Sequence, residues 1–244
     1  AAPDDRAGLI PALPAPDDRF VSREVVTTTP AIPTTAELPP GLARGVALSA
    51  DGRIVALTLR AAASGADRTA VYRYDRATGT LAQGAQAQDG GIGIPTLSAD
   101  GQVIAFYAWA TTLTPGDTNA VQDAFVYDQA AGRLQRVSVS STGAQADDRT
   151  GDARATARPA LSADGALVAF HSRAGNLAAS DGNGLSDIFV HNRASGATTL
   201  ISLGPEGEPA NGDSSAPAIS GDGRRIVFES RATNLDPELA PNLV

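Results

Sequence analysis

Two short polar loops carry the residues best suited to site chemistry. Asp117-Thr118-Asn119-Ala120-Val121-Gln122-Asp123 and Asp181-Gly182-Asn183-Gly184-Leu185-Ser186-Asp187 share the spacing D-x-N-[GA]-x-x-D. Hard oxygen ligands at alternate positions, with a small residue that allows a sharp turn, suit Ca²⁺ in outline. The predicted calcium ligands are the two aspartates and the asparagine of each loop: Asp117, Asn119, Asp123, Asp181, Asn183 and Asp187.

The same loops have a second interpretation that needs no metal. Asp and Asn side chains cap turns through bonds to nearby backbone, and Asn tolerates a left-handed backbone conformation. Asp123 and Asp187 directly precede an apolar strand, where a turn-capping Asp is expected. Both loops also lack the long carboxylate-bearing tail of an EF-hand loop. The spacing therefore favours capping and leaves calcium open.

A second set of candidates lies at the ends of predicted strands. Arg60, Trp109, Arg173 and Arg231 hold one repeated position, and Tyr107, His171 and Glu229 stand two residues before the last three. A guanidinium beside an aromatic plane recognises anionic or sugar-like groups. The structural alternative is pairing of the arginines with aspartates of the adjacent loops, since structural ion pairs are common. The predicted binding residues are Tyr107, Trp109, His171, Arg173 and Arg231.

No catalytic residue is predicted. His171 and His191 are the only histidines, and neither a G-x-S-x-G elbow nor an H-E-x-x-H helix is present. Two histidines cannot form a three-His zinc site, and there is no cysteine to supply a thiolate ligand. Glycoside hydrolysis by paired carboxylates stays open, because the separation of two carboxylates cannot be read from a sequence. The residues therefore favour a protein that is not an enzyme.

The candidate residues belong to a fourfold repeat. Each copy has the form [LI]-S-[AG]-D-G followed by a short apolar strand, at 48–57, 97–106, 161–170 and 219–228. The Asp-Gly pair supplies the positive φ of a tight hairpin, so each copy predicts strand, turn and strand. A third strand is expected at 71–75, 124–128 and 188–192, and a fourth at 136–139 and 199–202. Four antiparallel strands per repeat predict an all-β fold of β-propeller blades.

The composite repeat resembles that of TolB-type β-propellers, which occur in bacterial envelope proteins. It consists of L-S-x-D-G-R, an apolar strand, S-R-A-x-N-L, D-x-N-G-x-x-D-I-F-V and a glycine turn, and it covers 41–244. The resemblance implies a propeller with about four blades visible. It is unspecific for function, because propellers serve as binding platforms, assembly modules and enzyme lids.

The ends of the chain predict how the blades are organised. We expect a Pro-rich arm at 1–40 and repeats at 41–93, 94–156, 157–215 and, in part, 216–244. Within the arm, 18–28 matches the third-strand sequence of the repeat and could supply the strands that the last repeat lacks. That would close a four-bladed ring and cover its edges. The alternatives are a fragment of a larger ring, and self-association through the arm as in domain swapping.

Charge and chain start bear on location and partners. A net charge of −8 disfavours nucleic acid and anionic lipid, and no apolar run approaches the ~18 residues of a membrane helix. The start Ala1-Ala2-Pro3-Asp4 is what signal-peptide cleavage leaves, although a trimmed chain would look the same. We therefore expect a periplasmic, cell-surface or secreted protein without membrane insertion.

Loop length indicates which face of the blades carries function. With strands named a to d from the centre outward, the a–b and c–d turns are short, while the b–c and d–a connections on the opposite face are longer and acidic. Variable loops on a rigid scaffold usually carry binding. We predict a non-catalytic binding or scaffold propeller whose long-loop face takes a protein or glycan partner. The alternative is a propeller-type hydrolase or lyase, or the propeller portion of a larger enzyme.

Overall fold

The structure is a computed structural model that describes residues 41–61, 68–151 and 157–236. These residues form β-strands and no helix. The strands are β1 Gly41–Leu48, β2 Ile54–Ala61, β3 Thr69–Asp75, β4 Thr80–Ala87, β5 Thr96–Leu97, β6 Val103–Ala108, β7 Asp123–Asp128, β8 Arg133–Arg136, β9 Ala160–Leu161, β10 Leu167–Ser172, β11 Asp187–Asn192, β12 Thr198–Leu200, β13 Ser214–Ile219 and β14 Ile226–Ser230.

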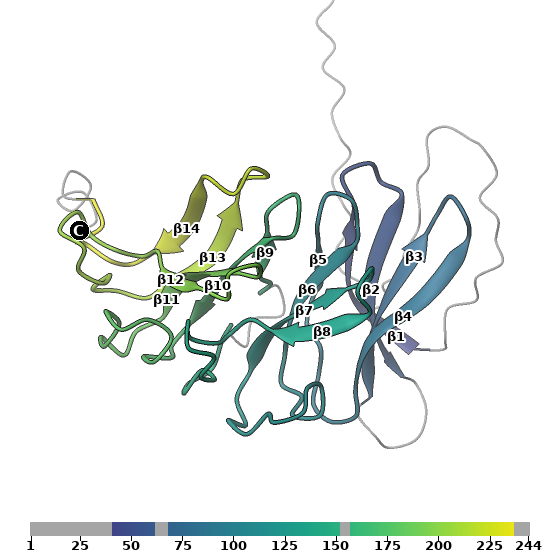
Figure 1. Cartoon of the computed structure of the whole chain (residues 1–244), viewed down its shortest axis with the longest axis horizontal. Helices are drawn as coiled ribbons and strands as arrows, with labels where there is room; N and C mark the ends of the chain where they lie inside the picture. The colour runs from purple at the N-terminus through teal and green to yellow at the C-terminus, as the bar shows by residue number, and fades with distance from the viewer. Residues whose placement is uncertain (1–40, 62–67, 152–156, 237–244) are drawn as a thin grey trace, which may run out of the picture. The chain divides into compact units, whose positions relative to one another are not determined.

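The strands form antiparallel sheets in which chain neighbours are also sheet neighbours (Figure 1). The orders are β1-β2-β3-β4, β5-β6-β7-β8 and β9-β10-β11-β12, and the described part of the last sheet is the pair β13-β14. We call these sheets the first to fourth blades. The all-β fold with four-stranded antiparallel propeller blades, predicted from the repeat, is confirmed.

The same side-chain bonds build the Asp-Gly hairpin of every blade. In the first blade, the Ser49 hydroxyl donates to Asp51 Oδ1 at 2.6 Å and accepts from the Ile54 amide at 2.8 Å. Gly52 has a φ of +68°, as the turn requires. Equivalent bonds recur from Ser98 to Asp100, from Ser162 to Asp164 and from Ser220 to Asp222. The repeated S-x-D-G sequence is therefore a turn motif.

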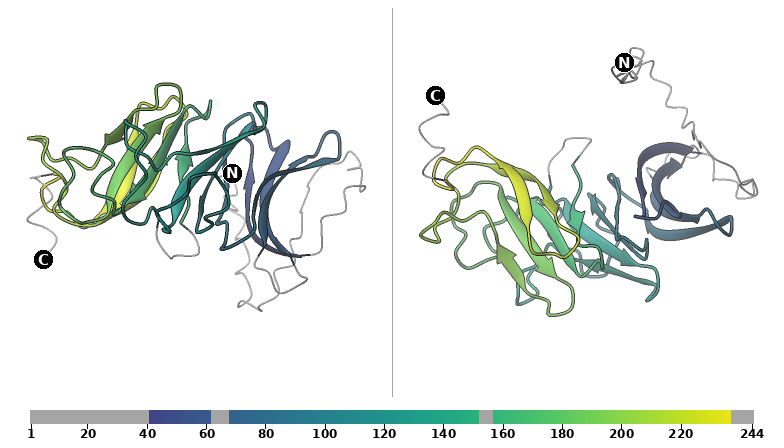
Figure 2. Two further views of the ribbon diagram at one scale, coloured as in Figure 1. Left: turned by 60° about the horizontal axis from the view of Figure 1, so that its bottom comes forward. Right: turned by 90° about the horizontal axis from the view of Figure 1, so that it is seen from above.

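Backbone hydrogen bonds join the hairpins of successive blades. The amide of Ala50 donates to Ala99 O at 2.9 Å, that of Ala99 to Ala163 O at 2.8 Å, and that of Ala163 to Gly221 O at 2.9 Å. These bonds hold equivalent turns next to one another, and the blades follow each other in chain order (Figure 2). Equivalent residues of neighbouring blades therefore face each other.

The core lies between blades, as the repeat predicts. Phe106 belongs to the apolar cluster between the first and second blades, and Phe170 to the cluster between the second and third. Both side chains are fully buried, and the equivalent Leu57 is 8% exposed. Phe228 holds the same position but is only half-buried. Phe106 and Phe170 stack on third-strand residues, Phe125 and Phe189, and no third strand of the fourth blade is among the described residues.

Two expectations differ from the structure or lie outside it. The fourth strands begin earlier than predicted, at Arg133 and Thr198, because pairing starts soon after the glycine turns at Gly132 and Gly196. The amide of Val137 still donates to Ala124 O at 2.9 Å, so the predicted 136–139 segment continues the pairing. Ring closure by 18–28 concerns residues outside the described ranges and stays a prediction.

Candidate functional site

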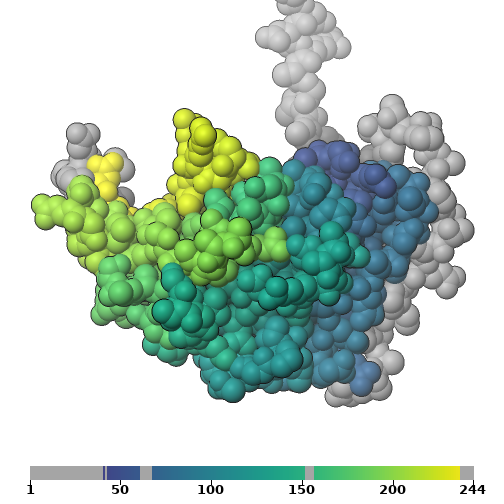
Figure 3. Space-filling view, viewed as in Figure 1, coloured from purple at the N-terminus to yellow at the C-terminus, as the bar shows by residue number. Residues whose placement is uncertain are grey.

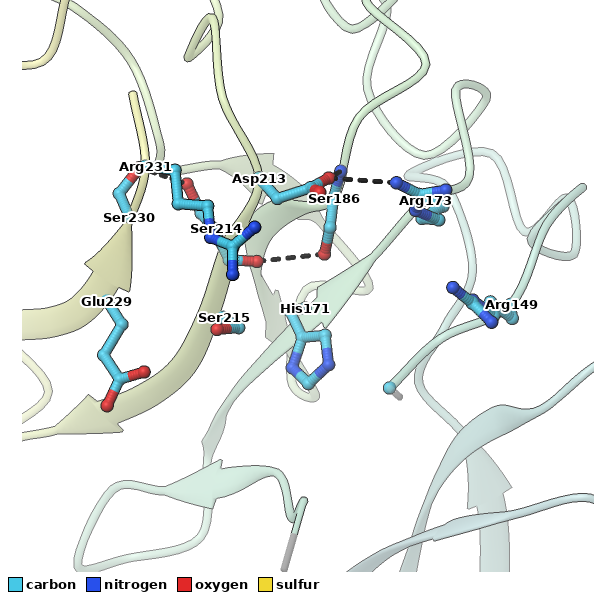
Figure 4. Close-up of a pocket in the computed structure, with 11 residues that line it drawn as sticks. Arg149, His171, Arg173, Ser186, Asp213, Ser214, Ser215, Glu229, Ser230 and Arg231 are labelled. Atoms are coloured by element: carbon cyan, nitrogen blue, oxygen red, sulfur yellow. Dashed lines mark hydrogen bonds and ion pairs between the residues drawn. The ribbon is translucent and has the colours of Figure 1, made fainter. Parts of the chain in front are cut away.

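A pocket of about 610 Å³ opens between the third and fourth blades. It lies on the long-loop face, which we define as the face that carries the b–c and d–a connections. Figure 3 shows the yellow fourth-blade hairpin beside the green residues of the third blade, and Figure 4 shows the pocket itself. The lining residues are Arg149, Gly151, His171, Arg173, Ser186, Asp213, Ser214, Ser215, Glu229, Ser230 and Arg231.

Backbone pairing places these residues at equivalent positions of two blades. The Arg173 amide donates to Arg149 O at 3.0 Å, and the Arg231 amide donates to Asp213 O at the same distance. Arg173 and Arg231 therefore directly follow equivalent strands, β10 and β14, in the repeated position that the sequence indicates. Arg149 and Asp213 in turn hold matching positions in two successive d–a connections. The pocket is thus built from a repeated frame whose side chains differ between blades.

A change of side chain explains why the space opens between these two blades. Between the second and third blades, a Cβ on Gly151 would lie only 2.9 Å from the Tyr107 ring, so that ring fills the space. The equivalent pair between the third and fourth blades is His171 and Ser215, since Ser215 pairs with Glu229 as Gly151 pairs with His171. The imidazole is smaller than the phenol and leaves room for a pocket.

Asp213 organises the upper wall of the pocket. Its Oδ1 accepts hydrogen bonds from the Ser186 amide at 2.9 Å and from the Arg173 guanidinium at 3.1 Å. The amide first, and then the guanidinium, lower the pKa of Asp213 below its ordinary value. Asp213 is therefore a carboxylate that ties the third-blade b–c loop to β10 and to the connection before β13.

The remaining charges of the pocket are less constrained. Figure 4 shows the Arg149 and Arg231 side chains on opposite sides of His171, with Glu229 beyond Ser215. Arg231 and Glu229 are exposed, and Arg149 is half-buried. The long-loop face was expected to be acidic, but three arginines line this pocket against two carboxylates. The local charge therefore has the opposite sign to that of the whole chain.

The structure brings together three of the five predicted binding residues. His171, Arg173 and Arg231 line the pocket. Tyr107 is buried behind it, and its hydroxyl lies 3.4 Å from His171 Nδ1. Trp109 is not among the lining residues and is 46% exposed at the equivalent place in the second blade. The expected pairing of strand-end arginines with b–c loop aspartates is also not seen for Arg173, whose partner Asp213 precedes β13.

Sequence reasoning did not predict the other lining residues as binding residues: Arg149, Gly151, Ser186, Asp213, Ser214, Ser215, Glu229 and Ser230. Both Arg149 and Asp213 lie 51 positions after the serine of the preceding S-x-D-G motif, Ser98 or Ser162, so alignment on that motif brings them into register. Counting backward from the strand that follows each connection does not do so, because Arg149 lies 11 residues before Ala160 and Asp213 lies one residue before Ser214. The backbone pairing with Arg173 and Arg231 shows the same match.

The two D-x-N loops show the capping arrangement. Asn119 Nδ2 donates to Asp123 Oδ2 at 3.0 Å and to Ala146 O at 3.0 Å. Asn183 repeats this arrangement with Asp187 at 2.8 Å and with Ala210 O at 2.9 Å. In both loops the asparagine directs its nitrogen, not its oxygen, at the aspartate. In the ranges described, no three His, Cys, Asp or Glu side chains are grouped to hold a metal ion. The calcium site stays a prediction.

The first aspartates of the two loops have different surroundings. The Arg136 guanidinium lies 2.9 Å from Asp117 and 3.4 Å from Asp123. In the third blade, Leu200 stands in the place of Arg136. Asp181 is 7% exposed, and neither of its carboxylate oxygens has a hydrogen-bond partner among the described residues. Burial, followed by the negative charge of Asp187, raises the pKa of Asp181 to about 6.

Comparison with known proteins gives similarity of structure only. No protein family and no curated protein matches the sequence. A putative TolB from Agrobacterium tumefaciens has a TM-score of 0.46 at 17% identity, over 78% of this chain and 55% of its own. The β-propeller domain of the Trilobed protease from Pyrococcus furiosus has a TM-score of 0.45 at 12% identity, over 65% of this chain and 41% of its own. Porphyromonas gingivalis dipeptidyl peptidase 4 has a TM-score of 0.47 at 16% identity, over 76% of this chain and 29% of its own.

The chain therefore spans less than two thirds of the length of these structures. In the ranges that the structure describes, no helix is long and apolar enough to cross a membrane.

Proposed function

We propose that the chain is a non-catalytic, TolB-type binding propeller of an extracytoplasmic compartment, which holds a protein or glycan partner on its long-loop face. The observation that carries this proposal is the pocket between the third and fourth blades. Its volume of about 610 Å³ falls within the roughly 300–1,000 Å³ of ligand sites. Its walls come from strand ends and long connections, the parts of a rigid scaffold where binding usually resides.

The hydrogen bonds of the pocket support binding more than catalysis. The Ser186 hydroxyl donates to Ser214 O at 2.9 Å, and the Ser214 and Ser230 hydroxyls lie 2.9 Å apart. These hydroxyls are held by the scaffold, whereas a serine nucleophile needs a bond to a general base. The hydrolase, lyase and larger-enzyme alternatives stay predictions from the sequence.

The blades themselves suggest a variant that closes the pocket. His171→Tyr combined with Ser215→Gly reproduces the Tyr107–Gly151 packing that fills the space between the second and third blades. A ligand that binds only the native state raises the melting temperature. Thermal melting of the wild type with acidic, basic and neutral peptides and oligosaccharides should therefore identify ligands. A ligand that acts through the pocket should not stabilise the double variant.

The matched control is Arg224→Gln, which changes an exposed arginine in the Asp-Gly hairpin of the fourth blade. The control should respond to the same ligands as the wild type. The proposed function is contradicted if no panel member stabilises the wild type. It is also contradicted if every stabilising ligand acts equally on the double variant, because binding then occurs elsewhere.

A further inference from the structure

Two of the three pocket arginines have side chains that are available to a ligand. The Arg173 guanidinium is engaged with Asp213 at 3.1 Å. In the part of the chain that the structure describes, no ion pair or hydrogen bond joins the guanidinium of Arg149 or Arg231 to another residue, and the charge of Arg231 acts on Asp213 only by helping to lower the pKa of that carboxyl. The two face the pocket from opposite sides (Figure 4). A guanidinium presents a planar fork of N–H donors that matches a carboxylate.

The charge of the pocket favours an anion. Three arginines line it, and the carboxylate of Asp213 is already paired with Arg173. Glu229 is the other acidic lining residue, and it is exposed. A local excess of positive charge attracts anions, although the chain as a whole carries a net charge of −8.

The lining also bears on which kind of anion fits. The lining residues include no Trp, Tyr or Phe, so a sugar ring would find none of their aromatic faces to stack on. A carboxylate side chain needs only the guanidinium forks and a polar surround. We therefore propose that Arg149 and Arg231 anchor the carboxylate of an acidic protein segment. This inference rests on the proposed binding function and names the chemistry of the partner.

The test uses two capped peptides of equal length, one of alternating Glu and Gly and one of alternating Gln and Gly. Isothermal titration calorimetry of the full chain measures the affinity of each peptide. The Glu peptide should bind at least about tenfold more tightly, because charge-assisted hydrogen bonds are roughly twice as strong as neutral ones. Added salt should weaken the binding of the Glu peptide and leave the affinity of the Gln peptide unchanged, since salt screens exposed charges.

Single variants assign the interaction to the two arginines. Arg149→Gln and Arg231→Gln should each lower the affinity for the Glu peptide about tenfold or more, because each removes one charged donor. Arg224→Gln, outside the pocket, should leave its affinity unchanged. Melting curves of all three variants check that they fold like the wild type, as expected for guanidinium groups that make no hydrogen bond or ion pair among the described residues.

Different results separate this inference from the proposed function. Equal affinity of the two peptides, or unchanged affinity in both arginine variants, overturns the carboxylate assignment. The assignment to a protein segment is overturned if an oligogalacturonate binds to the pocket and the Glu peptide does not bind. In each of these cases the proposed function stands if some panel ligand still stabilises the wild type and not the pocket-closing variant.

Discussion

The Arg136 guanidinium lies 2.9 Å from the Asp117 carboxylate, and the two side chains are only 8% and 2% exposed. Arg136 Nε also lies 3.4 Å from Asp123, and the guanidinium lies over the Phe125 ring at 5.8 Å. Removing one partner of a buried pair leaves an uncompensated charge. This arrangement therefore makes Arg136 a central residue for the stability of the second blade.

We expect Arg136→Leu to lower the free energy of unfolding by about 3–5 kcal/mol, because it leaves Asp117 and Asp123 buried without their cation. Arg133→Leu on the same strand is the matched control, since Arg133 is exposed and should change stability by about 0.5 kcal/mol or less. Urea unfolding of both variants measures the difference. Equal small effects would show that the Arg136 ion pairs contribute little.

Asp181 should make stability depend on pH in an unusual direction. Its pKa is about 6 in the folded chain against 3.8 for the free group, so the folded state holds the proton more tightly. Protonation of Asp181 stabilises the folded state, and this stabilisation is fully present below about pH 3.8 and is lost as pH rises through about 6. Asp181→Asn, which stays neutral, should therefore be more stable than wild type at pH 7.5, with a smaller advantage at pH 5.

Asp117→Asn is the matched control for that experiment, because it weakens an ion pair with Arg136 and should destabilise the chain at pH 7.5. Urea unfolding at the two pH values, compared with wild type, measures both variants. An Asp181→Asn variant that is less stable than wild type at pH 7.5 would mean that the ionised carboxylate has a stabilising partner.

The capping arrangement of the D-x-N loops predicts indifference to calcium. Asn119 and Asn183 bond their aspartates through nitrogen, so neither loop needs an ion to hold its shape. We expect the melting temperature to be the same with added calcium and with chelator. A ligand that binds only the native state would raise it. A fall in melting temperature on chelation would therefore support the calcium site predicted from the sequence.

Core positions of successive blades should differ in their contribution to stability. Phe170 is fully buried and stacks on Phe189 with ring centroids 5.8 Å apart. Phe170→Ala should cost about 3–5 kcal/mol, as for other buried aromatic residues. Phe228→Ala should cost less, because Phe228 is half-buried. Denaturant unfolding compares the two, and an equal or larger loss for Phe228 would mean that it is covered more fully than the described residues show.

The sequence was sufficient for the blades because their signals are local. Ser49, Asp51 and Gly52 determine a hairpin through bonds within a few residues, and the same bonds recur in each repeat. The buried positions of Phe106 and Phe170 follow from their fixed distance to that turn. Such features need no knowledge of which blades touch.

The pocket could be predicted only in part, because it depends on contacts between blades. His171, Arg173 and Arg231 were found from their repeated strand positions. Arg149 was not found, because its alignment with Asp213 along the repeat matches two residues of opposite charge and does not by itself indicate a shared pocket. The space itself arises from His171 where the neighbouring blade has Tyr107, and its consequence appears only when the two blades are packed.

The central claim, that the pocket between the third and fourth blades is a binding site, is tested most directly by amide chemical-shift mapping. The ¹⁵N-labelled chain is titrated with a panel ligand that raises the melting temperature of the wild type. The account predicts the largest shifts at Arg149, His171, Ser186, Ser215 and Arg231, and none at the Asp-Gly hairpins of Gly52, Gly101, Gly165 and Gly223. Shifts that cluster at these hairpins, or an absence of shifts around His171 at a saturating concentration of that ligand, would contradict it.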